Sequence, residues 1–258
     1  MPAPMNHKSF TISVSGALLN VSATVRAAGE DLLVFIHGLG CSGETFRDVW
    51  QRPEFDAYSI LCLDQPGFGL STAPEGFSYS MEDQALVCAK VLSHYPSKRL
   101  HLVGHSMGGA IGLLLPQKVL DSVESFTNVE GNLNAEDCVF GSREVSRVSY
   151  DVFVSELLPE FKRSSENWVL NGLNTVSPYA FHESAKSLVA WSDSGKLLRA
   201  FHDLSCRKVY IYGEQNADHP TVATVEGISR IEIKRAGHFV MNDNPDQFYS
   251  ELLRFIRD

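Results

Sequence analysis

Residues 100–115 place the strongest constraint on how this chain can fold. The apolar run Leu100–Val103 predicts a buried strand, Gly109–Leu115 predicts a helix, and Gly104-His105-Ser106-Met107-Gly108 joins them. A strand that turns sharply into a helix forces the residue at the apex into a strained backbone conformation. Side chains two positions away on either side would clash, which explains the two glycines. We therefore expect Ser106 to expose its hydroxyl above a sheet edge, at the positive end of a helix dipole.

Short apolar or β-branched runs recur along the chain, with helical stretches between them. From Leu32 onward these runs are nearly continuous in hydrophobicity, as expected for strands of a parallel sheet that helices cover on both faces. The first two runs flank Gly16 and can form an antiparallel hairpin. The runs are Phe10–Val14, Leu18–Ser22, Leu32–Ile36, Ile60–Leu63, Leu100–Val103, Phe126–Val129, Val209–Tyr212 and Ile231–Ile233. The sequence therefore predicts a doubly wound, mostly parallel α/β fold. Pro116 should kink or end the helix after Ser106, because proline lacks a backbone donor.

Residues 132–201 break this rhythm of strands and are helical and aromatic in pattern. We expect a helical cap here, inserted after the strand that ends near Glu130, so that residues 1–131 and 202–258 together form the core. Aromatic residues at helical spacing most often belong to a core, and most of these should pack the cap onto the main domain. They are Phe140, Tyr150, Phe153, Phe161, Trp168, Tyr179, Phe181 and Trp191.

Charge and composition exclude several classes of partner. The net charge is −9 over 258 residues, with acidic and basic residues interspersed, so no basic face for nucleic acid is expected. No apolar run has the length of a membrane span, and the first residues do not have the pattern of a secretion signal. The five cysteines form no metal-ligand spacing, which is typical of reduced, buried thiols. These features predict a cytoplasmic protein that acts on a small molecule without membrane or nucleic acid, and they leave the oligomeric state open.

Four segments, in this order, resemble the α/β-hydrolase fold superfamily, and in particular its serine esterases. His37-Gly38-Leu39-Gly40 resembles the oxyanion-hole loop, Asp64 to Ser71 resembles the DxxGxGxS turn, and Gly104 to Gly108 matches GxSxG. Ala236-Gly237-His238-Phe239 lies where the family keeps its catalytic histidine. The resemblance implies that Ser106 is a nucleophile and that the backbone N–H groups of Leu39 and Met107 form an oxyanion hole. No cofactor or metal is implied.

His238 is the best candidate for the general base among the nine histidines. Its loop follows the final predicted strand, from which it can return to Ser106, and a neutral imidazole accepts a serine proton near neutral pH. His37, His101 and His105 lie near the same strand ends. They lack acidic partners at metal spacing, so we interpret them as packing or loop-bracing groups and not as zinc ligands.

The third member of the catalytic set departs from the family pattern. The family usually takes its acid from a Gly-x-x-Asp turn after the penultimate strand, but here the turn is Gly213-Glu214-Gln215-Asn216. A neutral amide cannot stabilise an imidazolium by charge. Glu130, at the end of the strand after the nucleophile's helix, is the preferred acid, because some relatives take theirs from that position. Asp218 is the alternative.

These residues favour hydrolysis of a carboxylic ester, or a related acyl bond, of a small to medium hydrophobic substrate. Two other functions use the same scaffold. One is cofactor-independent lyase or oxygenase chemistry, in which the Ser–His pair removes a proton without acylation. The other is a ligand receptor that turns over slowly.

Overall fold

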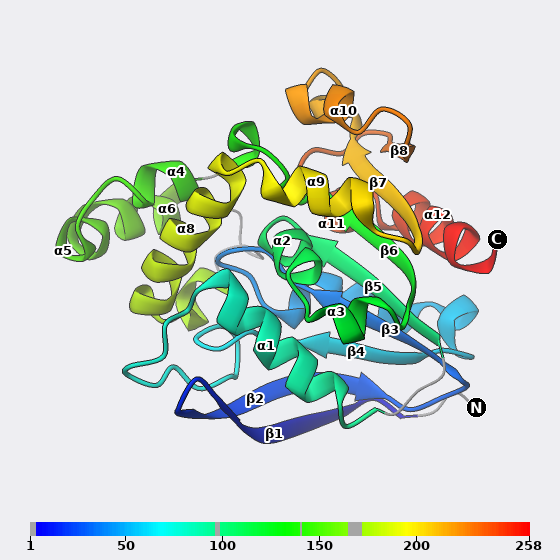
Figure 1. Cartoon of the computed structure of the whole chain (residues 1–258), viewed down its shortest axis with the longest axis horizontal. Coiled ribbons are helices and arrows are strands. Elements are labelled where there is room, and N and C mark those ends of the chain that lie inside the picture. The colour runs from blue at the N-terminus through cyan, green and yellow to red at the C-terminus, as the bar shows by residue number, and fades with distance from the viewer. Residues whose placement is uncertain (1–3, 96–98, 140, 165–171) are drawn as a thin grey trace.

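A mostly parallel sheet of eight strands forms the centre of the protein (Figure 1). The structure is a computed structural model, and it describes residues 4–95, 99–139, 141–164 and 172–258. The strand order across the sheet is β1-β2-β4-β3-β5-β6-β7-β8. The strands are β1 (Asn6–Val14), β2 (Ala17–Arg26), β3 (Asp31–Ile36), β4 (Ser59–Leu63), β5 (Arg99–His105), β6 (Val123–Val129), β7 (Arg207–Gly213) and β8 (Ser229–Ile233). Each of the eight predicted runs lies in one of these strands.

The direction of the strands also agrees with the sequence pattern. β1 and β2 form an antiparallel hairpin whose turn contains Ser15 and Gly16, both with positive φ. β2 pairs antiparallel with β4, and all pairs from β4 to β8 are parallel. The doubly wound α/β fold predicted from the sequence is therefore confirmed.

Helices cover both faces of the sheet. The helices are α1 (Met81–Leu92), α2 (Met107–Leu113), α3 (Gln117–Leu120), α4 (Ser142–Val145), α5 (Tyr150–Val152), α6 (Leu158–Ser164), α8 (Pro178–Asp193), α9 (Lys196–Asp203), α10 (Pro220–Thr224), α11 (Val240–Asp243) and α12 (Pro245–Arg257). Short turns of tighter or wider helix are η1 (Gly43–Gln51), η2 (Pro53–Phe55), η3 (Ala135–Asp137), η4 (Phe153–Leu157) and η5 (Glu214–Asn216). One hydrophobic core joins α1, α2, α8 and α9 to the sheet, and a second joins η1, α11 and α12 to its other face.

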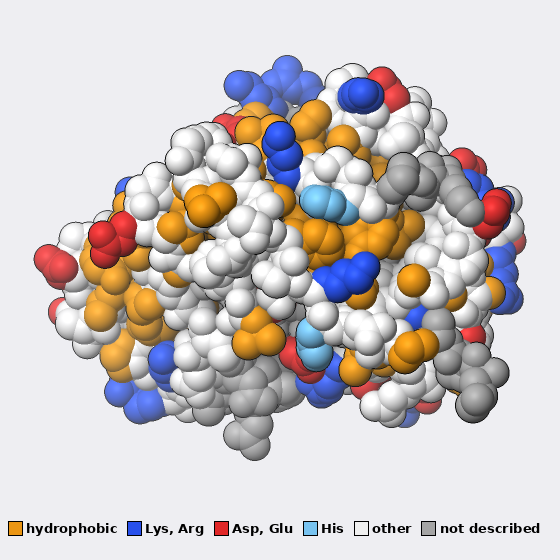
Figure 2. Space-filling model, turned by 90° about the horizontal axis from the view of Figure 1, so that it is seen from below, with side chains coloured by type: hydrophobic (Ala, Val, Ile, Leu, Met, Phe, Trp, Pro, Cys, Tyr) orange, Lys and Arg blue, Asp and Glu red, His pale blue; other side chains and the backbone are white. Residues whose placement is uncertain are grey.

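Charged side chains are dispersed over the surface. Figure 2 shows Lys and Arg interspersed with Asp and Glu on one face, with hydrophobic side chains between them. No helix within the described ranges is both long enough and apolar enough to cross a lipid bilayer.

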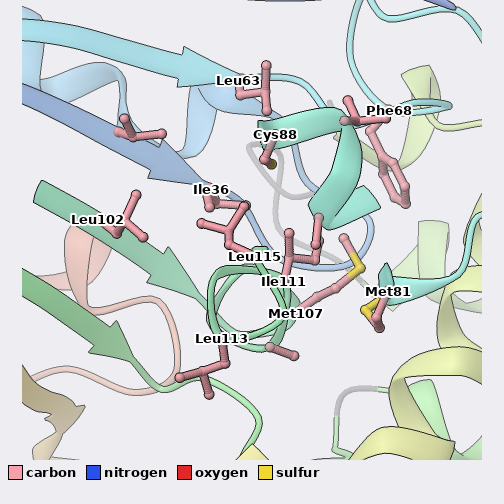
Figure 3. Close-up of a cluster of buried hydrophobic side chains, with 14 of the residues drawn as sticks. Ile36, Leu63, Phe68, Met81, Cys88, Leu102, Met107, Ile111, Leu113 and Leu115 are labelled. Atoms are coloured by element: carbon pink, nitrogen blue, oxygen red, sulfur yellow. The ribbon is translucent and has the colours of Figure 1, made fainter. Parts of the chain in front are cut away.

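Helix α2 is packed tightly against the parallel strands. In Figure 3, Ile36 and Leu102 from the strands lie on one side of α2, and Met81 lies on its other side. The helix ends at Leu113, and α3 begins after Pro116, whose fixed φ suits the start of a helix. The prediction that Pro116 interrupts the helix is confirmed.

In the described part of the segment between β6 and β7, the regular elements are helices. We call residues 132–201 the proposed cap. Phe153 and Phe181 are buried there, with their rings stacked at 5.3 Å, whereas Tyr150 and Tyr179 are exposed. Phe140 and Trp168 lie outside the described residues. The boundary near residue 201 stays a prediction, because α8 and α9 also pack directly on the core helices α1 and α2.

Candidate active site

Ser106 lies between β5 and α2 with the strained backbone that the sequence predicts. Its φ and ψ are 52° and −120°, and its N–H donates to the carbonyl of Val129 on β6. A Cβ atom on Gly104 would lie 2.6 Å from the oxygen of Gly108, and one on Gly108 would lie 2.1 Å from the oxygen of Ile36. Only glycine fits at these two positions, so the packing of β3, β5 and α2 fixes the turn that carries Ser106.

A small cavity of about 30 Å³ contains the candidate nucleophile and base. Ser106 and His238 both line it, although they are 132 positions apart and follow different strands. The remaining lining residues are Gly38, Leu39, Cys41, His105, Asn132, Asp137, Val139, Ser142, Leu188 and Phe239. Val139, Ser142 and Leu188, which belong to the proposed cap, lie against the candidate nucleophile in this cavity.

The two predicted oxyanion donors lie beside Ser106. Leu39 follows β3 and lines the cavity, and Met107 is the first residue of α2. Within the described parts of the chain, neither backbone N–H donates to a protein acceptor. The first N–H groups of a helix have no partner inside the helix, which leaves the N–H of Met107 available as a donor, and the oxyanion hole formed with Leu39 stays a prediction.

Glu130 lies next to His238. It follows β6 with a φ of 48°, and its N–H donates to the carbonyl of Ile211 on β7. Its Oε2 lies 3.6 Å from Nδ1 of His238, and both side chains are less than a tenth exposed. Its Oε1 accepts hydrogen bonds from the N–H of Gly213 at 2.7 Å and from Nδ2 of Asn216 at 3.0 Å. The contact with His238 is longer than a good hydrogen bond, as is common in catalytic sites without substrate.

The alternative acid, Asp218, is exposed in the connection between η5 and α10. The geometry therefore favours Glu130, which follows β6 and lies beside the ring of His238 in the loop after β8.

His37 braces a loop near the site, whereas His101 lies near the start of β5, away from Ser106, so the expectation that it lies at the same strand ends is wrong. His37 accepts from the N–H of Gln65 through Nε2 and donates through Nδ1 to the carbonyl of Gly38. His101 bonds to the hydroxyl of Ser125. Burial lowers the pKa of both rings, so they are neutral at neutral pH. Among the described residues, no group of three or more His, Cys, Asp or Glu side chains is placed to hold a metal ion.

His105 holds the loop of the candidate base. Its Nε2 donates to the carbonyl oxygen of His238 at 3.0 Å, and the two rings pack with centroids 4.8 Å apart. Burial, and secondly the neighbouring His238, hold the pKa of His105 well below its ordinary value. The neutral ring carries its one proton on Nε2, because this nitrogen donates to the carbonyl oxygen of His238.

Two other titratable groups, Cys41 and Asp137, line the cavity. Burial raises the pKa of the Cys41 thiol to about 11, so it is not a thiolate at neutral pH. Burial also raises the pKa of Asp137, whose carboxylate accepts from the N–H groups of Leu133 and Asn134 and from the hydroxyl of Thr221. Asp137 thereby ties the segment leaving β6 to α10.

The interpretation of His105 as a packing or loop-bracing group agrees with its bond to the loop of His238. The contact between Asn216 and Glu130 is not predictable from the sequence, because it joins residues 86 positions apart, from two strand ends. The one signal available was the place of Asn216 in the Gly213-x-x-Asn216 turn, where the family keeps a group that reaches the histidine.

Comparison with known proteins agrees with this fold. The profile of the alpha/beta hydrolase fold family matches residues 31–152. The uncharacterized hydrolase YugF of Bacillus subtilis is 38% identical over 101 residues, which make up 39% of this chain and 36% of YugF. The chain thus matches little more than a third of that relative's length.

Two solved structures superpose over nearly the whole chain. The N-acyl homoserine lactonase AidH, with bound N-hexanoyl homoserine, has a TM-score of 0.77 at 19% identity and covers 99% of this chain and 97% of its own. An esterase from Thermogutta terrifontis has a TM-score of 0.72 at 20% identity and covers 98% of this chain and 100% of its own. At these identities the likeness concerns the fold. Together with the family profile, which matches less than half of the chain, it confirms the α/β-hydrolase fold that the sequence predicts.

Proposed function

We propose that the protein is a serine hydrolase that cleaves a carboxylic ester through Ser106, His238 and Glu130. The observation that carries this proposal is the shared cavity of Ser106 and His238, with the Glu130 carboxylate 3.6 Å behind the imidazole. The hydrolase relative YugF and the esterase fold neighbour support it. A small to medium hydrophobic ester suits the apolar wall formed by Leu39, Val139 and Leu188.

The mechanism follows from the position of each group. Glu130 keeps the proton of His238 on Nδ1, so that Nε2 can take the proton of Ser106 as its Oγ attacks the ester carbonyl. The oxygen of the tetrahedral intermediate accepts from the N–H groups of Leu39 and Met107. The intermediate collapses, and the leaving alcohol receives the proton from His238. Water then attacks the acyl-enzyme with His238 again as base, which releases the acid and restores Ser106.

A series of p-nitrophenyl esters of increasing acyl length tests this function. We expect turnover by the wild type, none by Ser106→Ala, and a loss of about 10⁴-fold in kcat for Glu130→Gln, the loss seen when the triad acid of a serine protease becomes an amide. Asp218→Asn, which changes an exposed acid in the same region, serves as the control and should resemble the wild type. The preferred acyl length would define the substrate pocket.

Two outcomes would reject the proposal. A wild type inactive on the whole series, although a fluorophosphonate labels Ser106, would favour a lyase, an oxygenase or a slow receptor. An equal loss in Glu130→Gln and Asp218→Asn would remove Glu130 from the proposed triad.

A further inference from the structure

Asn216 occupies the turn where the superfamily usually carries its catalytic acid, and the structure gives this amide a partner. Its Nδ2 donates to Oε1 of Glu130 at 3.0 Å, beside the N–H of Gly213 at 2.7 Å. We propose that Asn216 is a positioning residue that holds one oxygen of the Glu130 carboxylate, so that the other oxygen faces His238. This inference rests on the proposed function of Glu130.

The two carboxylate oxygens of Glu130 have different contacts. Both donors bind Oε1, and Oε2 lies 3.6 Å from Nδ1 of His238. A glutamate side chain has three rotatable bonds, and neither its own backbone nor the single N–H of Gly213 fixes the rotation of the carboxylate. A second donor on the same oxygen fixes that rotation. Without Asn216, the buried carboxylate would lose one of two hydrogen bonds and turn more freely.

An amide fits this position better than the usual acid. An aspartate at 216 would place a second carboxylate at hydrogen-bond distance from Glu130, and two such groups cannot both be ionised without strong repulsion. The asparagine therefore follows from the position of Glu130: once the negative charge comes from the end of β6, the end of β7 needs a donor.

Positions 130 and 216 lie beyond neighbouring strand ends. β6 and β7 are parallel, with Val129 opposite Ile211, and Glu130 and Asn216 extend from the same edge of the sheet. We therefore expect that the acid and the amide can be exchanged between positions 130 and 216, so that the charge still reaches His238.

The experiment measures the second-order rate at which a fluorophosphonate labels Ser106, together with kcat and KM on the best p-nitrophenyl ester. Asn216→Leu keeps the volume and removes the donor. We expect labelling and kcat to fall about 10- to 100-fold, as for loss of a hydrogen bond to a charged group, with little change in KM. Gln215→Leu removes a neighbouring amide from the same turn, η5, and is the matched control.

Two charge variants separate positioning from a structural role. Glu130→Gln combined with Asn216→Asp should label at least about 10-fold faster than Glu130→Gln alone. Asn216→Asp alone should add an ionisation to the pH profile of labelling that the wild type lacks, because the paired carboxylates share a proton. These results do not require Asn216→Leu to fold.

The outcomes separate this inference from the proposed function. If the wild type is labelled, and Asn216→Leu labels at the rate of Gln215→Leu while the double variant shows no rescue, the positioning role is wrong and the proposed function stands. If the wild type is not labelled at all, the proposed function itself fails, and the role of Asn216 fails with it.

Discussion

Ser106 and Glu130 both have backbones that residues with a side chain rarely adopt, with φ values of 52° and 48°. Such positions cost about 1–3 kcal/mol each and persist only where the surroundings fix them. Here the fixing contacts come from neighbouring strand ends, since the N–H of Ser106 donates to Val129 and that of Glu130 donates to Ile211. The packing of the sheet therefore holds both groups in place before any substrate binds.

Gly108 should tolerate no side chain. In Gly108→Ala the new Cβ would meet the oxygen of Ile36 at 2.1 Å, and the turn at Ser106 must shift. We expect the free energy of unfolding, measured by urea denaturation, to fall by about 3 kcal/mol, with loss of Ser106 labelling. Gly76→Ala is the control, because a Cβ there meets nothing within 4 Å and only its positive φ adds strain. A Gly108→Ala variant that labels normally would contradict this account.

Cys41 lines the same cavity as Ser106, yet it should take no part in the reaction. Burial raises the pKa of its thiol to about 11, which leaves almost no thiolate at pH 7.5. We expect Cys41→Ala to retain fluorophosphonate labelling and the native protein to resist iodoacetamide at this position, as read by peptide mass. Alkylation of Cys41 at neutral pH in the folded protein would show that the thiol is more reactive than its burial implies.

At the level of single residues, local sequence identified Ser106, because the glycines and flanking apolar runs form one continuous pattern. The preference for Glu130 over Asp218 rests on its strand end and on relatives that take their acid from that position. The structure places Glu130 beside His238, and its catalytic role stays a prediction. Asn216 and His105 act through contacts with distant segments, which no local pattern contains. Their partners depend on how the loops after β7 and β8 fold back on the sheet.

The helices above the cavity are joined by an ion pair between α4 and α8. Arg143 binds Asp193 with both of its terminal nitrogens at 2.7 Å and also donates to the carbonyl of Ala135. Ser142 and Leu188, on these same helices, line the cavity of about 30 Å³. The pair therefore holds α4 against α8 within the proposed cap.

Arg143→Gln should loosen this arrangement with little loss of stability. Partly exposed pairs contribute only about 0.2–1 kcal/mol, so we expect a small change in unfolding free energy. Labelling of Ser106 by a bulky fluorophosphonate should become faster, since the cavity must enlarge to admit it. Arg254→Gln, which removes an exposed pair with Glu251 on α12, is the control. Unchanged or slower labelling in Arg143→Gln would mean that the pair does not limit access.

The strands were predictable because each contains a short apolar run, but their lengths were not. β1 begins at Asn6, four residues before the predicted run, because its outer half is exposed and carries polar side chains. Between β6 and β7, α4, α5 and α6 are short, with the wide turn η4 between α5 and α6, whereas α8 is long and uninterrupted.

Three buried histidines should make the whole molecule sensitive to acid. Burial lowers the pKa of His37, His101 and His105 below the ordinary value of 6.5, so the unfolded chain binds more protons than the folded one as the pH falls below that value. The three neutral rings therefore do not reduce the free energy of unfolding above pH 6.5, and this free energy falls progressively below that pH. Each contributes at most about 1.4 kcal/mol per pH unit to the slope of unfolding free energy.

Urea denaturation at several pH values between 7.5 and 5 measures this slope. His105→Gln should give a shallower slope than the wild type, because one of the three groups is gone. His7→Gln, at an exposed position, should keep the slope of the wild type. Equal slopes for all three proteins would show that protonation of His105 is not coupled to unfolding.

Because Glu130 lies at the end of β6, most of the proposed catalytic residues come from roughly the first half of the sequence. The proposed nucleophile, the oxyanion donors and the acid all lie before residue 131, and the base arrives from the last fifth of the chain. A gene cut after Glu130 would thus give one fragment with the proposed nucleophile, oxyanion donors and acid, and a second with His238 and Asn216. Neither fragment would be an enzyme, and activity on mixing would report their reassembly, which makes the fold a basis for a two-part reporter.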